Sequence, residues 1–390
     1  MRIVKFAALA LLALLIGLAV ASVWGWYALN PSPPAAQLFI NGPILTLDEA
    51  IPNPQAVLVE GREITFAGDE SEARSRAPGT VVVHDLNGHT LMPGLIDAHG
   101  HFPGWGVMAV AADLNSPPIG TVKTIDDLKA RIAAKAASQP PGSLVLGMGY
   151  DDTLLAEHRH PTRADLDEAA PDHRVIITHI SGHMLVASSN VLEAHSITAD
   201  TPDPPGGEIV RDGEGRPTGL LKETAGDPLL QDAYGFGPSQ MLTMLRAGVA
   251  DYLAKGVTLA QNGFTERGFF DPMGWASRIG VVPIRLSLLV DAPFGFERDD
   301  EGALFAYESD RFHVAGVKII TDGSIQGYTG YLSKPYAVPG EGMAPDYRGY
   351  PIHSQQALNA MVARAYALGL RPYLHGNGDA AIDMILDAIE

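Results

Sequence analysis

The stretch that decides the fold is Leu91-Met92-Pro93-Gly94-Leu95-Ile96-Asp97-Ala98-His99-Gly100-His101. It is a short apolar run with a Pro-Gly turn, expected to form a buried strand, and it ends in two histidines one residue apart. Because side chains alternate along a strand, His99 and His101 face one side, whereas Gly100 points away and leaves room. Neutral imidazole is a common zinc ligand, and two imidazoles from one strand occupy two coordination positions of one ion. The pattern predicts a metal site and favours a hydrolase.

Spacing alone does not single out this pair. With 13 histidines in 390 residues, chance would place a His-x-His pair about 0.4 times, which is within the false-positive risk of short motifs. A second pair does occur, His158 and His160, ahead of Pro161 in a polar segment. No strand precedes it, so we expect this second pair to lie in a surface loop. The strand that precedes His99 and His101 therefore carries the argument.

Composition limits the class of protein. A chain of 390 residues with 46% hydrophobic residues suits a large α/β barrel with attachments. Lys+Arg number 27 and Asp+Glu 45, a net charge of −18, which disfavours nucleic acid and anionic lipid surfaces as partners. The absence of cysteine excludes disulfides, thiolate metal sites and cysteine nucleophiles. A transition-metal site would have to use histidine, carboxylate or modified lysine.

Residues 1–29 are predicted to form a signal peptide or a membrane anchor. Arg2 and Lys5 precede an uncharged run rich in Ala and Leu, a pattern that keeps the start of the chain cytoplasmic and sends the rest across the membrane. Ala19-Val20-Ala21 resembles a cleavage site, but the apolar run continues far enough to span a bilayer, so we favour an uncleaved anchor. A Pro-rich linker at residues 30–36 follows. We expect the protein to face the extracytoplasmic side of a membrane or to be exported.

Residues 37–93 are predicted to form part of a small β-sandwich domain. Apolar runs flank turn residues there, and Asn41-Gly42 is a strong signal for a hairpin. From Gly94 to Glu390, short apolar strands alternate with helical stretches, which is typical of parallel βα units. Residues 115–235 interrupt this spacing and are predicted to be an insertion.

The expected architecture is an incomplete (β/α)8 barrel of the TIM type over residues 94–390. About five barrel strands can be recognised, whereas a closed barrel of this type has eight. The candidate strands are Leu95–Ala98, Thr258–Gln261, Ile284–Val290, Val314–Thr321 and Arg371–His375.

Two further strands carry chemistry. Lys318 lies in an apolar strand, and both faces of a barrel strand are buried, so an unpaired ammonium there would be costly. An ion pair with Asp322, two steps along the same face, would offset that cost, and so would carboxylation of the lysine between two metals. His375 stands at the end of the next strand, where barrel enzymes place catalytic groups.

Four segments of the chain, in order, resemble the amidohydrolase superfamily, in particular its YtcJ-like, type 3 branch. They are residues 91–101, residues 161–167 with Ser181-Gly182-His183 downstream, residues 317–324 and residues 375–381. The resemblance implies a metal-dependent hydrolase that cleaves a C–N bond, of the amide type and not a peptide bond, in a small molecule.

The resemblance also implies roles for single residues. His99 and His101 would hold one metal, Lys318 as a carbamate would bridge it to a second, and His375 would bind that second ion. Two zinc ions are expected, with a metal-activated hydroxide attacking the carbonyl carbon. The candidates for the substrate pocket are His183, Trp105 and Asp322, with a core or rim position as the alternative for Trp105.

The family also uses a histidine on the sixth barrel strand and an aspartate on the eighth, and both would fall after Glu390. We therefore expect a fragment of a longer protein. The alternative is a truncated homologue, catalytically impaired or non-catalytic, that only binds ligand or metal. Deamination or ester cleavage is a third hypothesis, and Lys318 argues against deamination. The expected partners are an amide-like small molecule and the membrane, while a homo-oligomer is left open.

Overall fold

A computed structural model describes residues 34–390 apart from 234, 339, 341 and 342. The predicted signal peptide or anchor at residues 1–29 lies outside the described residues. Within the described part of the chain, no helix has both the length and the apolar character needed to cross a bilayer. The chain divides into two compact units, each of which is described by itself.

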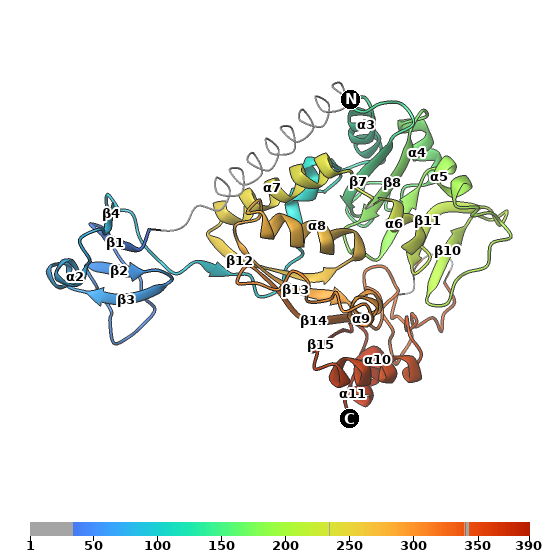
Figure 1. Ribbon diagram of the computed structural model, residues 1–390. Coiled ribbons are helices and arrows are strands. Elements are labelled where there is room, and N and C mark those ends of the chain that lie inside the picture. The colour runs from blue at the N-terminus through green and yellow to red at the C-terminus, as the bar shows by residue number, and fades with distance from the viewer. Residues whose placement is uncertain (1–33, 234, 339, 341–342) are drawn as a thin grey trace, which may run out of the picture. The chain divides into compact units, whose positions relative to one another are not determined.

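The first unit contains a four-stranded sheet in the order β3-β2-β1-β4, with helix α2 (Glu70–Arg76) against it (Figure 1). Alternate residues of the first strand are buried, as expected for a sheet with one covered face. The strands are β1 (Ala36–Ile40), β2 (Ala56–Glu60), β3 (Glu63–Gly68) and β4 (Val82–Asp85). The core residues are Leu38, Ile40, Ala56, Leu58 and Ala73. The described residues show one sheet here, so the second sheet of a sandwich stays a prediction.

The hairpin predicted at Asn41-Gly42 is wrong. Strand β1 pairs with β2 and, in parallel, with β4, whereas Ile44 makes only an isolated bridge with Leu91. Asn41 has a φ of 63° and its side-chain amide donates to Asp85 at 2.8 Å. The turn therefore docks against the end of β4 instead of folding the chain back onto β1.

The second unit begins at Asp97 and contains a six-stranded mixed sheet in the order β10-β11-β9-β8-β7-β6, of which all strands but β6 lie in the predicted insertion. Its strands are β6 (Ala112–Asp113), β7 (Leu144–Tyr150), β8 (Arg174–His179), β9 (Met184–Ala187), β10 (Gly207–Arg211) and β11 (Pro217–Glu223). Strands β6, β7 and β8 are parallel, and the others join antiparallel. The helices of this segment are α3 (Ile125–Ala136), α4 (Arg163–Ala169), α5 (Ser189–Ala194) and α6 (Asp227–Ala233).

The five predicted barrel strands are all present and form one sheet in the order β15-β14-β13-β12-β5 (Figure 1). They are β5 (Leu95–Ile96), β12 (Val257–Thr265), β13 (Arg285–Asp291), β14 (Phe312–Ile320) and β15 (Pro372–His375). The pairings of β5 with β12, of β13 with β14 and of β14 with β15 are parallel. The fold class is therefore α/β, and the described strands make an open half of a barrel.

Helices join and flank these strands. They are the 3-10 helix η1 (Gly104–Ala109), α7 (Pro238–Ala254), α8 (Arg267–Arg278), α9 (Ala292–Asp300), α10 (Gln355–Ala367) and α11 (Asp379–Ile389). The predicted burial of the strand before His99 is wrong, because Leu95 and Ile96 are 47% and 69% exposed. Strand β5 stands at the edge of the sheet, with β12 as its neighbour.

Candidate metal centre

His99 is held in one orientation by a glutamine from the neighbouring strand. Its Nδ1 lies 2.9 Å from Oε1 of Gln261 in β12. An amide oxygen only accepts hydrogen bonds, so Nδ1 carries the hydrogen and Nε2 keeps its lone pair, which is the usual arrangement behind a metal-ligating histidine. Gly263 leaves space for the ring, since a Cβ there would lie 2.5 Å from Cε1 of His99. The sequence pattern did not reveal this support by Gln261.

The prediction that His99 and His101 share one face of a strand is wrong, because β5 ends at Ile96, but the two rings still lie side by side. The two ring centroids are 5.6 Å apart, at 80° to each other, and the backbone of His101 forms a bridge with Asn262. Partial burial lowers the pKa of His101, and His99 and Lys318 lower it further. The ring is therefore held in the neutral form, which is the form that binds a metal.

Lys318 points away from the helix that covers its strand. Its neighbour Val317 packs towards α9, where a Cβ on Gly295 would lie 3.1 Å from Cγ1 of Val317. Because side chains alternate along β14, Lys318 faces the opposite side of the sheet. The charge of Lys318 lowers the pKa of both His101 and His375. Burial in turn lowers the pKa of Lys318.

Of the two alternatives for Lys318, the ion pair with Asp322 is not formed, since the described residues contain no ion pair of Lys318. Asp322 is fully buried, and its carboxylate accepts from the backbone N–H of Asn377 at 2.9 Å, Tyr331 at 2.7 Å and Gly378 at 2.8 Å. Strand β14 ends at Ile320, so the alternation that would align the two side chains stops before Asp322. These contacts favour a role for Asp322 in fixing the loop after His375 over the predicted substrate contact.

His375 ends β15, and the insertion places a further histidine beside it. The ring centroids of His375 and His183 are 5.3 Å apart. Burial lowers the pKa of His375, and so do His183 and Lys318. Its Nε2 lies 3.2 Å from Nδ2 of Asn377, a contact that a metal on this nitrogen would replace.

Trp105, in η1, is 45% exposed, and its place in a substrate pocket stays a prediction.

The family assignment rests on most of the chain. A model of the Amidohydrolase family matches residues 82–390. The chain belongs to the amidohydrolase family. This match and two relatives confirm the resemblance seen in the sequence, including its YtcJ-like branch. The chain spans 65% of the length of each of these two relatives, which is a little under two thirds.

Two curated relatives and one solved structure are similar to this amidohydrolase. N-substituted formamide deformylase of Arthrobacter pascens is 30% identical over 361 residues, which cover 90% of this chain and 65% of that protein. Putative amidohydrolase YtcJ of Bacillus subtilis (strain 168) is 28% identical over 359 residues, with the same coverage of 90% and 65%. An uncharacterized metal-dependent hydrolase from Pyrococcus horikoshii OT3 shares the fold, with a TM-score of 0.66, 24% identity and coverage of 91% of this chain and 68% of that one.

The donor set fits the divalent metal that the family implies. His99 has one nitrogen hydrogen-bonded and the other available, and His101 is held neutral. The amine of Lys318 reaches both His101 and His375 electrostatically. Imidazoles with an oxygen-bearing group are a usual ligand set for zinc. The histidine and aspartate that the resemblance implies for later strands are not among the described residues.

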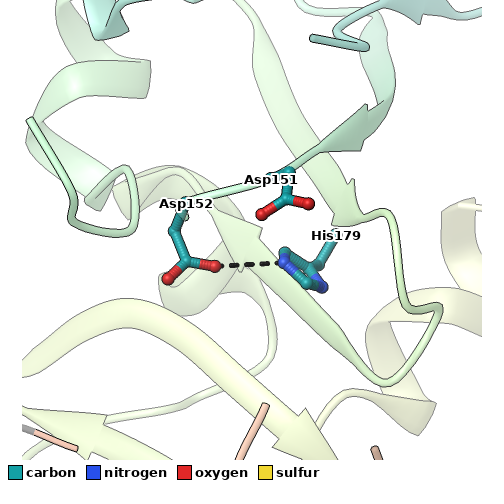
Figure 2. A group of neighbouring side chains, drawn as sticks. All are labelled: Asp151, Asp152 and His179. Carbon is teal, nitrogen blue, oxygen red and sulfur yellow. Dashed lines mark hydrogen bonds and ion pairs between the residues drawn. The ribbon is translucent and has the colours of Figure 1, made fainter. Parts of the chain in front are cut away.

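A second group of metal-capable side chains lies in the insertion (Figure 2). Ligand atoms of Asp151, Asp152 and His179 lie within 4.8 Å of one another. Nε2 of His179 is 3.1 Å from Oδ1 of Asp152, and Asp151 accepts from Gln326 at 2.9 Å. These groups already bond to protein, so the structure accounts for them as a hydrogen-bonded network that a cation would have to displace.

Sequence reasoning missed this network, although a signal was available. Asp151 and Asp152 directly follow β7, and His179 ends β8, its parallel neighbour. Carboxyl ends of adjacent parallel strands lie at the same edge of a sheet. Applying that rule to the insertion would have brought the three side chains together.

The prediction that His158 and His160 lie in a surface loop is wrong for His160. His158 is exposed, but Nδ1 of His160 lies 3.2 Å from the hydroxyl of Tyr150, and its Nε2 lies 3.6 Å from Asp152. Tyr150 is fully buried, so the segment that ends at His160 is anchored in the core of the insertion.

The half-buried His160 should make the stability of this amidohydrolase pH-dependent. Burial lowers the pKa of His160 from 6.5 to about 4. As pH falls from 7 towards 4, the unfolded chain takes up the proton first, so stability present above pH 6.5 is lost across this window. A pKa shift of this size corresponds to about 3 kcal/mol of stability. Urea unfolding at pH 7 and pH 5 should show a smaller loss for His160→Gln than for the wild type, whereas an equal loss in both would contradict the assignment.

Proposed function

We propose that the protein hydrolyses the C–N bond of a small amide that is not a peptide. In this proposal two divalent metal ions, with zinc as the expected metal, are held by His99, His101, Lys318 and His375. The observation that carries the proposal is the position of Lys318, which faces away from α9 and acts electrostatically on both His101 and His375. A single lysine that acts on two imidazole sites suits the role of a bridging ligand. Bound metal would acidify water and polarise the carbonyl.

In this proposal the chain's own residues orient the reaction. Gln261 holds His99 with Nε2 free. Lys318 would be carboxylated: the neutral Nζ would bond to the carbon of CO2 as one C–O π bond opens, and it would release one proton. The carbamate so formed would offer oxygens that could hold divalent metal ions. Asp322 fixes the loop after His375 through backbone N–H groups. His183 contacts the substrate from the insertion.

The relative from Arthrobacter pascens supports a substrate class. Its name describes an N-substituted formamide deformylase, and we propose the same class for this protein. The reaction R–NH–CHO + H2O → R–NH2 + HCOOH breaks one C–N bond and needs no redox partner. A non-catalytic binding protein is not favoured, because the family and this relative are hydrolases.

The test is an amide panel with the zinc-loaded, full-length protein. N-Butylformamide should yield formate and butylamine in equal amounts, N-butylacetamide should react more slowly, and a dipeptide should not react. Removal of the metal with a chelator should abolish turnover, and zinc should restore it. Turnover that survives metal removal would contradict the proposal, as would two bound metals without hydrolysis of any amide.

We also propose an extracytoplasmic location through the N-terminal anchor. The basic residues ahead of a long uncharged segment support it. Fractionation of cells that produce the full chain should place the protein in the membrane, accessible to protease from the outer side. Recovery in the cytoplasmic fraction would contradict this location.

A further inference from the structure

His183 is paired with a buried glutamate that sequence reasoning missed. Strands β9 and β11 are antiparallel, with Lys222 opposite Met184, so Glu223 stands opposite His183. The backbone N–H of Glu223 donates to the carbonyl of His183 at 2.9 Å. Nδ1 of His183 lies 3.0 Å from Oε2 of Glu223. Both the backbone and the side chain thus fix this pair.

The position of Glu223 is conformationally demanding. Its φ is +48°, in the left-handed region that residues other than glycine seldom occupy. Its side chain is only 3% exposed, and Oε1 is buried with no hydrogen-bond partner. A buried carboxylate that is half satisfied is costly. Gly323 makes room for it, since a Cβ there would lie 2.0 Å from Oε1.

The pair determines which nitrogen of His183 is available. An ionised carboxylate only accepts hydrogen bonds, so Nδ1 of His183 carries the hydrogen and Nε2 keeps a lone pair. Among the described residues, no partner of Nε2 is found. The ring of His183 also lies 5.3 Å from that of His375. An unpaired acceptor therefore stands beside the candidate metal ligands.

We propose that Glu223 is a positioning residue that holds His183 with Nε2 as an acceptor for the N–H of the substrate. The substrates are then amides with one hydrogen on the scissile nitrogen, and tertiary amides are poor substrates. This inference rests on the proposed function for its substrate and on the structure alone for the orientation of His183.

The first test measures the tautomer of His183 and needs no activity. The protein is labelled with 15N-histidine and studied by NMR at pH 8 without metal. The resonances of His183 are identified as those that disappear in His183→Gln, and they should show the Nδ1–H tautomer. Glu223→Leu removes the acceptor and should shift the population towards Nε2–H. Asp227→Asn, which removes a carboxyl group four residues away, is the matched control and should change nothing.

Two outcomes of the NMR test overturn the positioning role. One is an Nε2–H tautomer in the wild type, and the other is an unchanged tautomer in Glu223→Leu. If that variant fails to fold, the isosteric Glu223→Gln replaces it, and the Nδ1–H population should fall because a neutral amide is a weaker acceptor. An unchanged population in Glu223→Gln would then overturn the role.

The second test compares N-butylformamide with N-butyl-N-methylformamide, which lacks the N–H. The wild type should prefer the N–H substrate by about tenfold in kcat/KM, the value of one hydrogen bond to the reacting group. His183→Ala and Glu223→Leu should lose about tenfold on the N–H substrate only, with metal content unchanged. Equal losses on both substrates would overturn the inference, and a loss of metal in His183→Ala would make His183 a ligand instead.

The failures of the two proposals can be distinguished. If the wild type hydrolyses neither formamide, the proposed function and the substrate part of this inference fall together, and NMR still decides the role of Glu223. If both formamides react at the same rate, the proposed function stands and the N–H acceptor is excluded.

Discussion

Replacement of Lys318 by alanine should lower kcat/KM about a thousandfold, which corresponds to ~4 kcal/mol of transition-state stabilisation. The loss is expected because this one side chain acts on both His101 and His375, and as a carbamate it would supply the oxygens between two ions. The measurement is amide hydrolysis with the metal content determined in the same samples. Bicarbonate with a short carboxylic acid should restore part of the activity of Lys318→Ala, since a free carboxylate can take the place of the missing group.

The matched control for this prediction is Lys135→Ala. Lys135 is another lysine whose pKa is lowered by burial, but it lies on α3 in the insertion. Its replacement should leave turnover within about twofold of the wild type, as expected for a residue away from the reacting groups. Unchanged turnover in Lys318→Ala would exclude the carbamate, and a similar loss in both variants would point to a general loss of folding.

Replacement of His99 or His101 by alanine should remove about one of two bound metal ions and lower activity about a thousandfold. The two rings lie side by side in the segment that follows β5, and the interaction of His99 with Gln261 leaves its Nε2 free to bind an ion. Metal content would be measured by elemental analysis of the dialysed protein. His158→Ala, which changes the exposed histidine of the other pair, should keep both ions.

Full metal occupancy in His99→Ala and His101→Ala would contradict the assignment of the first site. A gel-filtration profile and a thermal melting curve like those of the wild type would show that the variants are folded. The metal site would then be sought at Asp151, Asp152 and His179, whose ligand atoms also lie close together.

The barrel strands could be predicted because each is a short apolar run of the length that parallel strands require. All five predicted strands are present, with shifts of a few residues at their ends. The same runs carry His99, Lys318 and His375 at or near their carboxyl ends, so the strand assignment and the site assignment depended on one signal. Burial was predicted less well, since Leu95 lies in an edge strand and stays exposed.

The wrong predictions came from contacts between distant parts of the chain. Asn41-Gly42 has the local signature of a hairpin, but Asn41 bonds to Asp85, 44 residues later. Asp322 has the right spacing for Lys318, but the loops at Tyr331 and Asn377 supply its partners. A local pattern does not contain these partners, because they are set by how the loops pack.

The pair of His183 and Glu223 shows the same limit within the candidate site. The two residues are 40 positions apart in the chain, and only the pairing of β9 with β11 brings them together. The sequence gives His183 a motif, but it gives no sign that Glu223 is its partner. The structure supplies that link and with it the orientation of the ring.

The central claim is that one pair of metal ions lies among His99, His101, Lys318 and His375. Anomalous diffraction at the zinc edge from crystals of the zinc-loaded protein tests it most directly. The account predicts two peaks, one beside the rings of His99 and His101 and one beside His375, with a carboxylated Lys318 between them. Peaks at Asp151 and His179 alone, or an unmodified Lys318 remote from both ions, would contradict it.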